Sequence, residues 1–331
     1  MIRVSFKNVG QGDSIIVEWS TNNKKSIGII DSNIHEGNNP ILEYLKENPT
    51  PVIDFIILSH FHYDHFSGMP DLFKYCLDKD IKINKFIHTF ASHVLDIYNR
   101  IFTTKKEETA SKSFFKYFDL LAEKNIEDFI LADCYTAPIQ LTESEYLSFL
   151  APTGKTYHQI AKNISRKNTG IIISHPDVNK LSTITCIQNE KKFILLTSDA
   201  ERKSFRFINK KIKKQLTAIQ VPHHGSYNSI NPNFWKSVKR INHCPAILSV
   251  GDEPKDKLPD RQTIELIDKE GYNIYSTNLV YGLCDYFQLP TSTTSNAKTT
   301  CLNLFSVKRA GTSIKAPTIN KYFGEKVLDL F

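Results

Sequence analysis

The segment HFHYDH, residues 60–65, constrains this chain more than any other, because it directly follows the apolar segment VIDFIILS. A continuous apolar run of this kind predicts a strand that is buried on both faces, as in a parallel sheet. Polar groups placed at the end of such a strand cost free energy unless a partner binds them. Three histidines and one aspartate within this hexapeptide therefore favour a cation site.

Three other strand-like segments end in residues of the same kind. The segment VPHHGS places His223 and His224 after an apolar run. The segment FILLTSD ends at Asp199, and SIGIID ends at Asp31. Polar residues at strand ends gather at one edge of an open α/β sheet, where such folds place their sites. Together the strand ends predict one shared site.

Histidine and aspartate favour a divalent transition metal. Imidazole and carboxylate are good ligands for zinc and manganese, and a carboxylate can bridge two ions. In HFHYDH, His60 and His62 can reach one position, and Asp64 and His65 can reach a second. Two ions about 3.5–4 Å apart would hold a hydroxide and stabilise an oxyanion. The pattern thus predicts a metal-dependent hydrolase that binds one or two ions.

The composition is that of a globular protein, with 40% hydrophobic and 23% charged residues among 331. No apolar stretch approaches the roughly 18 residues expected of a membrane helix, and no apolar leader follows a basic start. The six cysteines form no CxxC pair, which favours reduced thiols and argues against a structural zinc finger. We therefore expect a cytoplasmic protein without a membrane segment.

Strand-like and helix-like segments alternate along the chain, which predicts one α/β domain over residues 1–290. A tight turn is expected at GQGD, and helices are expected at PILEYLKE, MPDLFKYCLD, NPNFWKSVKR and RQTIELIDKE. Residues 95–130 are rich in lysine, glutamate and aromatics, which predicts a helical insertion. Residues 291–331 begin polar, and we expect them to form an extension that packs on the domain or docks a partner.

The segments quoted above, with VGQGDSIIV, LSHFHYDHFSGM and AILSVG, resemble a known family in their order and spacing. HFHYDH matches the HxHxDH signature of the metallo-β-lactamase fold. The flanking segments look most like the hydrolase domain of the competence DNA-uptake protein ComEC and its stand-alone relatives. The resemblance runs over about residues 3–285 and implies an αββα sandwich with its metals at one edge of two sheets.

The resemblance also implies six metal ligands, namely His60 and His62 for a first ion, Asp64, His65 and His224 for a second, and Asp199 as a bridge. Catalytic roles are implied for Asp64, Asp199 and His223. Asp199 would help to orient a metal-bound hydroxide, and His223 or a metal-bound water would protonate the leaving oxygen. The alternative for His223 is a supporting position behind the ligands. Asp31 is expected to orient the HxHxDH loop by hydrogen bonding.

One position departs from the common pattern of the fold, which supplies a further histidine before the bridging aspartate. That region here reads HPDVNKLSTITC. Asn179 and Ser182 match the Asn-x-x-Ser of the competence-type subgroup, and His175 is the other candidate. A first ion with fewer protein ligands would make manganese more plausible beside zinc.

A phosphodiester in DNA, RNA or a nucleotide is the leading substrate. The formal charge is +7, and lysines gather in residues 208–215, although ordinary solvated faces would also explain them. The resemblance is compatible with a bacterial DNA-processing or antiviral defence system. Hydrolysis of an ester, amide or lactone is one alternative. The other is an effector subunit that is active only with a protein partner, docked through residues 95–130 or the C-terminal tail.

Overall fold

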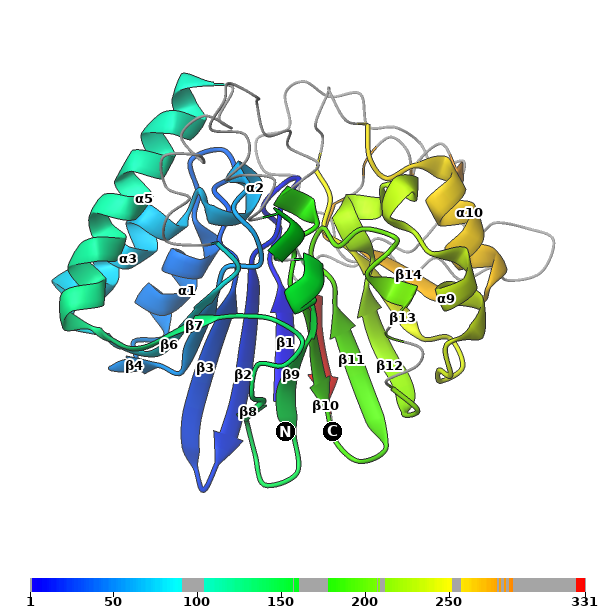
Figure 1. Ribbon diagram of the computed structural model, residues 1–331, viewed down its shortest axis with the longest axis horizontal. Helices are drawn as coiled ribbons and strands as arrows, with labels where there is room; N and C mark the ends of the chain where they lie inside the picture. The colour runs from blue at the N-terminus through cyan, green and yellow to red at the C-terminus, as the bar shows by residue number, and fades with distance from the viewer. Residues whose placement is uncertain are drawn as a thin grey trace.

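Two sheets packed face to face form the centre of the molecule, with helices on both outer sides (Figure 1). Helices α1, α3 and α5 cover one sheet, and α9 and α10 cover the other. The computed structural model describes residues 2–90, 104–156, 158–160, 178–206, 208, 212–251, 257–278, 280, 283, 286–287 and the backbone of 326–330. The αββα sandwich predicted from the sequence is confirmed.

The first sheet has eight strands in the order β15-β1-β2-β3-β5-β6-β4, with β7 paired to β6. Its strands are β1 (Ile2–Phe6), β2 (Ile15–Thr21), β3 (Lys24–Ile30), β4 (Val52–Ile53), β5 (Phe55–Ile57), β6 (Lys82–His88), β7 (Ile126–Leu131) and β15 (Lys326–Leu330). Strands β1, β2 and β3 are antiparallel, whereas β3, β5 and β6 are parallel. The parallel strands deliver their carboxyl ends to one edge.

The second sheet has seven strands in the order β14-β13-β12-β11-β10-β9-β8. Its strands are β8 (Ile139–Gln140), β9 (Tyr146–Ala151), β10 (Ile184–Gln188), β11 (Lys192–Leu196), β12 (Gln215–Gln220), β13 (Pro245–Leu248) and β14 (Asn273–Ser276). Strands β11 to β14 are parallel, so β11 and β12 also end at a common edge.

The helices bury apolar faces against these sheets. They are α1 (Pro40–Glu47), α2 (Tyr63–Phe66), α3 (Met69–Asp78), α5 (Lys105–Lys124), α9 (Pro232–Ser237) and α10 (Arg261–Lys269), with short 3-10 turns η3 (Pro222–Gly225) and η4 (Tyr227–Ser229). Helix α5 is the described helix of the predicted insertion, and a capping box between Thr104 and Glu107 sets its start. Its Phe114 is fully buried among apolar residues of α3 and the HxHxDH loop. None of the described helices is long and apolar enough to cross a bilayer.

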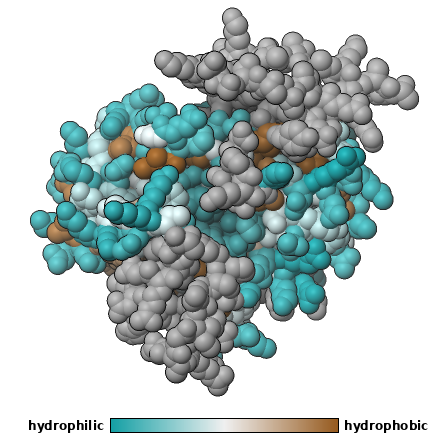
Figure 2. Space-filling view, turned by 90° about the horizontal axis from the view of Figure 1, so that it is seen from above, coloured by the Kyte–Doolittle hydropathy of each residue, from teal (hydrophilic) through white to brown (hydrophobic). Residues whose placement is uncertain are grey.

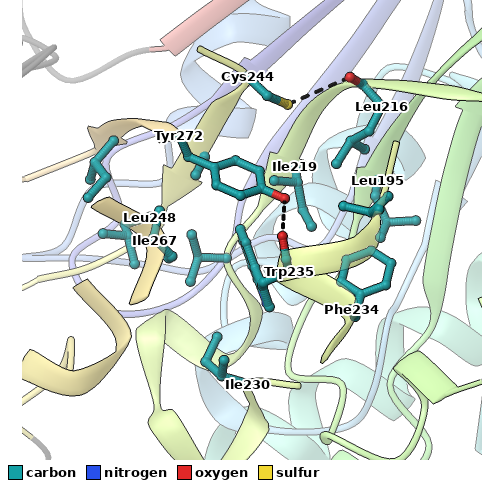
Figure 3. Packing of buried hydrophobic residues seen from close by; sticks show 14 of the residues in the cluster. Leu195, Leu216, Ile219, Ile230, Phe234, Trp235, Cys244, Leu248, Ile267 and Tyr272 are labelled. Atoms are coloured by element: carbon teal, nitrogen blue, oxygen red, sulfur yellow. Dashed lines mark hydrogen bonds between the residues drawn. The ribbon is translucent and has the colours of Figure 1, made fainter. Parts of the chain in front are cut away.

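Apolar side chains fill three layers, one between the sheets and one under each set of helices. Figure 3 shows the layer under α9 and α10, where Trp235 and Tyr272 lie ring to ring. The Tyr272 hydroxyl donates a hydrogen bond of 3.0 Å to the Trp235 carbonyl. This layer holds β12 and β13 rigidly, and these strands carry one side of the site described below.

Two local expectations were wrong. The run VIDFIILS forms two short strands, β4 and β5, because the Asp54 side chain accepts a hydrogen bond of 3.1 Å from the backbone N–H of Ile27. GQGD is part of a longer connection between β1 and β2 rather than a tight hairpin turn. The apolar segment GIIIS, residues 170–174, predicts a further strand and lies outside the described residues. The domain boundaries stay a prediction.

Candidate metal centre

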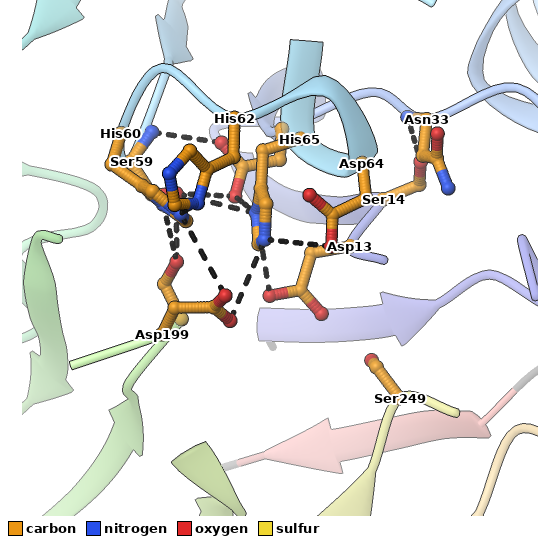
Figure 4. Close-up of polar contacts among 12 residues, drawn as sticks. Asp13, Ser14, Asn33, Ser59, His60, His62, Asp64, His65, Asp199 and Ser249 are labelled. Carbon is orange, nitrogen blue, oxygen red and sulfur yellow. Dashed lines mark hydrogen bonds and ion pairs between the residues drawn. The ribbon is translucent and has the colours of Figure 1, made fainter. Parts of the chain in front are cut away.

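Strands from both sheets end at the candidate site. Asp31 follows β3, and the loop of residues 60–65 follows β5 and leads into α2. Asp199 follows β11, and His224 lies in η3 directly after β12. Figure 4 shows the side chains of the first sheet converging on Asp199 of the second. The site therefore forms only when the two sheets pack together.

Four of the predicted ligands form one group, Asp64, His65, Asp199 and His224, in which one ligand atom from each lies within 4.8 Å of the others. His224 Nε2 lies 3.2 Å from Asp64 Oδ2 and 3.4 Å from Asp199 Oδ1. His65 Nε2 lies 3.5 Å from the same Asp199 oxygen. Two imidazole nitrogens and two carboxylates form a suitable donor set for zinc or manganese.

His60, His62 and Asp199 form a second group within the same 4.8 Å limit. His60 Nε2 lies 3.7 Å from Asp199 Oδ2 and 3.0 Å from His62 Nδ1. Asp199 thus presents Oδ1 to one group and Oδ2 to the other, which is the arrangement a bridging carboxylate requires. The structure brings all six predicted ligands together, and their roles as ligands stay a prediction.

Asp31 fixes the orientation of His65. Its carboxylate accepts hydrogen bonds from the Ser59 backbone N–H at 2.7 Å, the Ser59 hydroxyl at 2.6 Å and His65 Nδ1 at 2.8 Å. Donation from Nδ1 leaves the Nε2 lone pair directed at Asp64 and Asp199. Burial raises the pKa of Asp31 to about 6, although His65 opposes this shift. The contacts are those expected of a residue that orients the HxHxDH loop.

The adjacent residues His223 and His224 differ in their exposure to solvent. His224 is buried, and its Nδ1 donates a hydrogen bond of 2.7 Å to the Ser249 carbonyl, which directs Nε2 into the ligand group. The side chain of His223 is 30% exposed and lines the open pocket, with Nε2 3.6 Å from Asp199 Oδ2. His223 is therefore accessible to a substrate, as the prediction of a catalytic role requires.

Asn179 also lies at the site. Its Nδ2 is 3.4 Å from His223 Nε2, and its Oδ1 is buried without a hydrogen-bond partner among the described residues. Ser182, which follows Asn179 closely in the sequence, is also buried. Its hydroxyl has no hydrogen-bond partner in the described part of the chain. The other candidate, His175, lies outside the described residues.

Sequence reasoning missed two buried residues that tie the halves of the site together. Gln220 Nε2 donates a hydrogen bond of 2.8 Å to Asp13 Oδ2, and Asp13 Oδ2 lies 3.8 Å from His65 Nδ1. Gln220 Oε1 accepts hydrogen bonds from the backbone N–H groups of Thr197 and Ser198 at 2.9 and 3.0 Å. The only signal for Asp13 was an acidic residue after the glycines of GQGD, which predicted a turn.

The backbone is strained where it presents the site. Positive φ angles occur at Asp31 (57°), Ser198 (45°), His223 (50°) and His224 (52°), none of which is glycine. Left-handed backbone costs free energy in residues with a Cβ and persists where surrounding contacts enforce it. Strain of this kind clusters at functional sites, and here it turns the ends of β3, β11 and β12 toward one point.

The charges of the site fit a bound cation. Burial disfavours charge on His224, but the carboxylates of Asp199 and Asp64 outweigh it and raise its pKa to about 9. Burial and the neighbouring His65 and His62 hold the pKa of His60 well below its usual value. Among the described residues, the buried atoms His65 Nε2 and Asp199 Oδ1 have no hydrogen-bond partner. Buried nitrogen and carboxylate donors in this state are the groups that a divalent cation would satisfy.

An open pocket of about 830 Å³ lies over the ligand groups. Asp64, Asp199 and His224 contribute to its floor, and Arg202 and Lys203 line it at the side. Figure 2 looks down on this edge of the molecule and shows mainly hydrophilic residues where the described side chains are visible. Each residue that lines the pocket has a polar group in its side chain, so the pocket is suited to a polar substrate rather than to an apolar ligand.

The αββα sandwich carries a donor set suited to divalent cations at one edge of its two sheets. Residues 8–132 match the family model of the metallo-beta-lactamase superfamily. The matched residues include strands β2 to β7 and the HxHxDH loop of residues 60–65. No protein among the curated sequences matches the chain.

Several solved structures resemble the chain at low sequence identity. The metallo-beta-lactamase fold protein YhfI from Bacillus subtilis is 8% identical with a TM-score of 0.44, over 84% of this chain and 99% of that one. Zn(2+)-bound PqqB from Methylobacterium extorquens is 9% identical with a TM-score of 0.47, also over 84% and 99%. A diphosphatase from the PhnP family is 13% identical with a TM-score of 0.39, over 77% and 90%.

Proposed function

We propose that the protein is a metal-dependent phosphodiesterase that acts on DNA, RNA or a nucleotide. The observation that carries the proposal is the position of cationic side chains beside the metal centre. Arg202 and Lys203 line the same pocket as Asp64, Asp199 and His223. A phosphodiester carries a negative charge in both its ground state and its transition state, so guanidinium and ammonium groups favour it over a neutral ester or amide.

The six ligands, His60, His62, Asp64, His65, Asp199 and His224, would hold one or two divalent ions, zinc or manganese. Such an ion would acidify a water molecule and neutralise charge on the phosphate. The protein's own residues supply the remaining steps. Arg202 orients the phosphate, and His223 is placed to give a proton from Nε2 to the leaving oxygen, with Nδ1 held 3.1 Å from the Ser229 hydroxyl.

The experiment compares two substrate classes on the same preparations. Purified protein, first stripped with a chelator and then reloaded with manganese or zinc, is assayed on bis(p-nitrophenyl) phosphate and on p-nitrophenyl acetate. A His62→Ala variant controls for contaminating hydrolases. We expect phosphodiester hydrolysis that needs the metal and is lost in the variant, with at most weak ester hydrolysis. Metal-dependent ester hydrolysis without phosphodiester hydrolysis would contradict the proposal and favour an acyl substrate.

We also propose a relationship to the competence-type hydrolases, supported by Asn179 at the position that other members of the fold fill with histidine. The Nδ2 of Asn179 lies 3.4 Å from Nε2 of His223. Two histidines and one carboxylate can hold zinc, and the carboxylate makes manganese plausible beside it. Comparing the activities of manganese-loaded and zinc-loaded protein tests this preference.

A further inference from the structure

A second cavity lies next to the pocket over the metal centre. It has a volume of about 460 Å³ and is lined partly by Phe205, Pro232 and Phe234. Arg202 and Arg206 line both this cavity and the first pocket. The two hollows therefore meet at a pair of arginines, and a ligand that fills both must pass them.

Arg202 is held in place at this junction. Its Nη2 donates a hydrogen bond of 3.0 Å to the Tyr227 carbonyl, and its guanidinium lies 5.5 Å from the centre of the Tyr227 ring. The Asn231 side chain donates a hydrogen bond of 3.2 Å to the Arg202 carbonyl. The Nε of Arg202 is buried and has no hydrogen-bond partner in the part of the chain that the structure describes. A guanidinium held in place by these contacts is preorganised for an incoming anion.

Arg206 adds a second cation on the same side. Its side chain is exposed, and it forms no ion pair with any of the described residues. Two arginines between adjoining hollows provide more positive charge than one scissile phosphate needs. They are suited to the repeated negative charge of a polymer.

Apolar side chains also contribute to the lining of the second cavity. Phe205 and Phe234 are 0% and 1% exposed, with ring centres 5.1 Å apart, so they back the cavity, and Pro232 and Asn233 are its more exposed lining residues. Arginines beside a partly apolar hollow match a nucleotide, which has a charged phosphate and a flat base. A base that is paired and stacked in a duplex could not enter such a hollow, so the arrangement favours a single strand.

We propose that the substrate is a single-stranded polynucleotide that extends beyond the scissile phosphate. The scissile phosphate lies at the metal centre beside Arg202, the adjoining phosphate contacts Arg206, and a neighbouring base occupies the second cavity. This inference rests on the proposed phosphodiesterase function and narrows its substrate from any phosphodiester to a polymer. The assigned site is the cavity of Arg206, Asn233 and Phe234.

The test measures selectivity for the polymer. The ratio of kcat/KM for a single-stranded oligonucleotide to that for bis(p-nitrophenyl) phosphate is determined for the wild type, Arg206→Ala and Asn233→Asp. Lys24→Ala is a matched control, because Lys24 is an exposed cation in the β2–β3 hairpin, at the opposite end of the strands from α2 (Figure 1). We expect both cavity variants to lower the ratio by about three- to tenfold, which is typical of one lost charged hydrogen bond or one added repulsion. An unchanged ratio in both variants would overturn the proposal.

Failure of the proposed function would show separately, as no cleavage of either substrate by the wild type. A binding arm then tests the cavity without catalysis. A labelled single-stranded oligonucleotide and the corresponding duplex are titrated against wild type and Arg206→Ala in chelator, at several salt concentrations. Tighter single-strand binding, with a salt slope that falls by about 0.7 in Arg206→Ala, supports the proposal. Equal binding by the two proteins, or preference for the duplex, overturns it.

Discussion

Replacing Asp31 by asparagine tests how the site controls His65. The backbone N–H of Ser59 donates to Oδ1 of Asp31, so an asparagine must place its carbonyl oxygen there. The NH₂ group of the asparagine then takes the place of Oδ2, the atom that accepts a hydrogen bond of 2.8 Å from His65 Nδ1 in the wild type. Because this NH₂ group is a donor, His65 Nδ1 must act as the acceptor, and the proton of the imidazole ring moves to Nε2. Asp31→Asn should therefore remove His65 as a metal ligand without changing its position.

The magnitude follows from the same contacts. Loss of such a supporting carboxylate costs 10- to 100-fold in metal affinity, or about 1.4–2.7 kcal/mol. Stability without metal should not fall, because the buried charge is unfavourable in the folded protein. Burial raises the pKa of Asp31 to about 6 although His65 and Ser59 oppose this shift, so folding disfavours the charged form by about 3 kcal/mol with its hydrogen bonds already included. A neutral asparagine removes this cost.

The assay is competition for zinc or manganese with a chromophoric chelator, together with urea unfolding of the metal-free protein. Asp54→Asn is the matched control, because Asp54 also accepts from a backbone N–H of the first sheet but lies away from the ligand groups. We expect weaker metal binding in Asp31→Asn alone, without a lower unfolding midpoint in that variant. An unchanged metal affinity in Asp31→Asn would refute control of the His65 tautomer by Asp31.

Three further substitutions have defined outcomes. Gly12→Ala should weaken metal binding and lower Tm. Gly12 has a φ of 134°, and the added Cβ would overlap the backbone oxygen of Asp64. An unchanged Tm would contradict this prediction. Phe114→Ala should cost about 3–5 kcal/mol in urea unfolding, since the ring is fully buried and lies 5.1 Å from Phe61 in the HxHxDH loop; a loss below about 1 kcal/mol would refute this packing. Burial lowers the pKa of His88 from 6.5 to about 4, so the unfolded chain binds more protons between these values. Stability from this residue is complete above about pH 6.5 and falls toward pH 4, by about 1–3 kcal/mol, and His88→Gln should flatten the dependence of Tm on pH in that window.

Much of the fold could be predicted because local patterns carry it. PILEYLKE and MPDLFKYCLD form α1 and α3 with the expected bounds, since each has a proline in its first turn and an apolar face that is buried. The break in VIDFIILS could not be predicted, because it depends on the contact between Asp54 and Ile27 in a neighbouring strand. A sequence pattern alone does not show which strand will be that neighbour.

The candidate site could likewise be predicted only in part. The ligand residues stand in two short clusters and one strand end, and a cluster of metal-binding side chains is visible without a structure. The residues that support them are dispersed. Gln220 reaches Asp13 across 207 positions of the chain, and Ser59 joins Asp31 to the second-sheet residue Ser198, whose hydroxyl donates to it at 2.7 Å. Such residues can be found only when the two sheets are placed together.

The central claim is that Asp199 joins two ligand groups into one metal centre. Its most direct test is the metal content of purified protein, measured by mass spectrometry after loading with manganese or zinc and removal of free ions. We expect at least one ion per wild-type chain and a large loss in Asp199→Asn, with Asp54→Asn retaining the wild-type content. Wild-type protein that retains no ion, or an Asp199→Asn variant that retains all of it, would contradict the account.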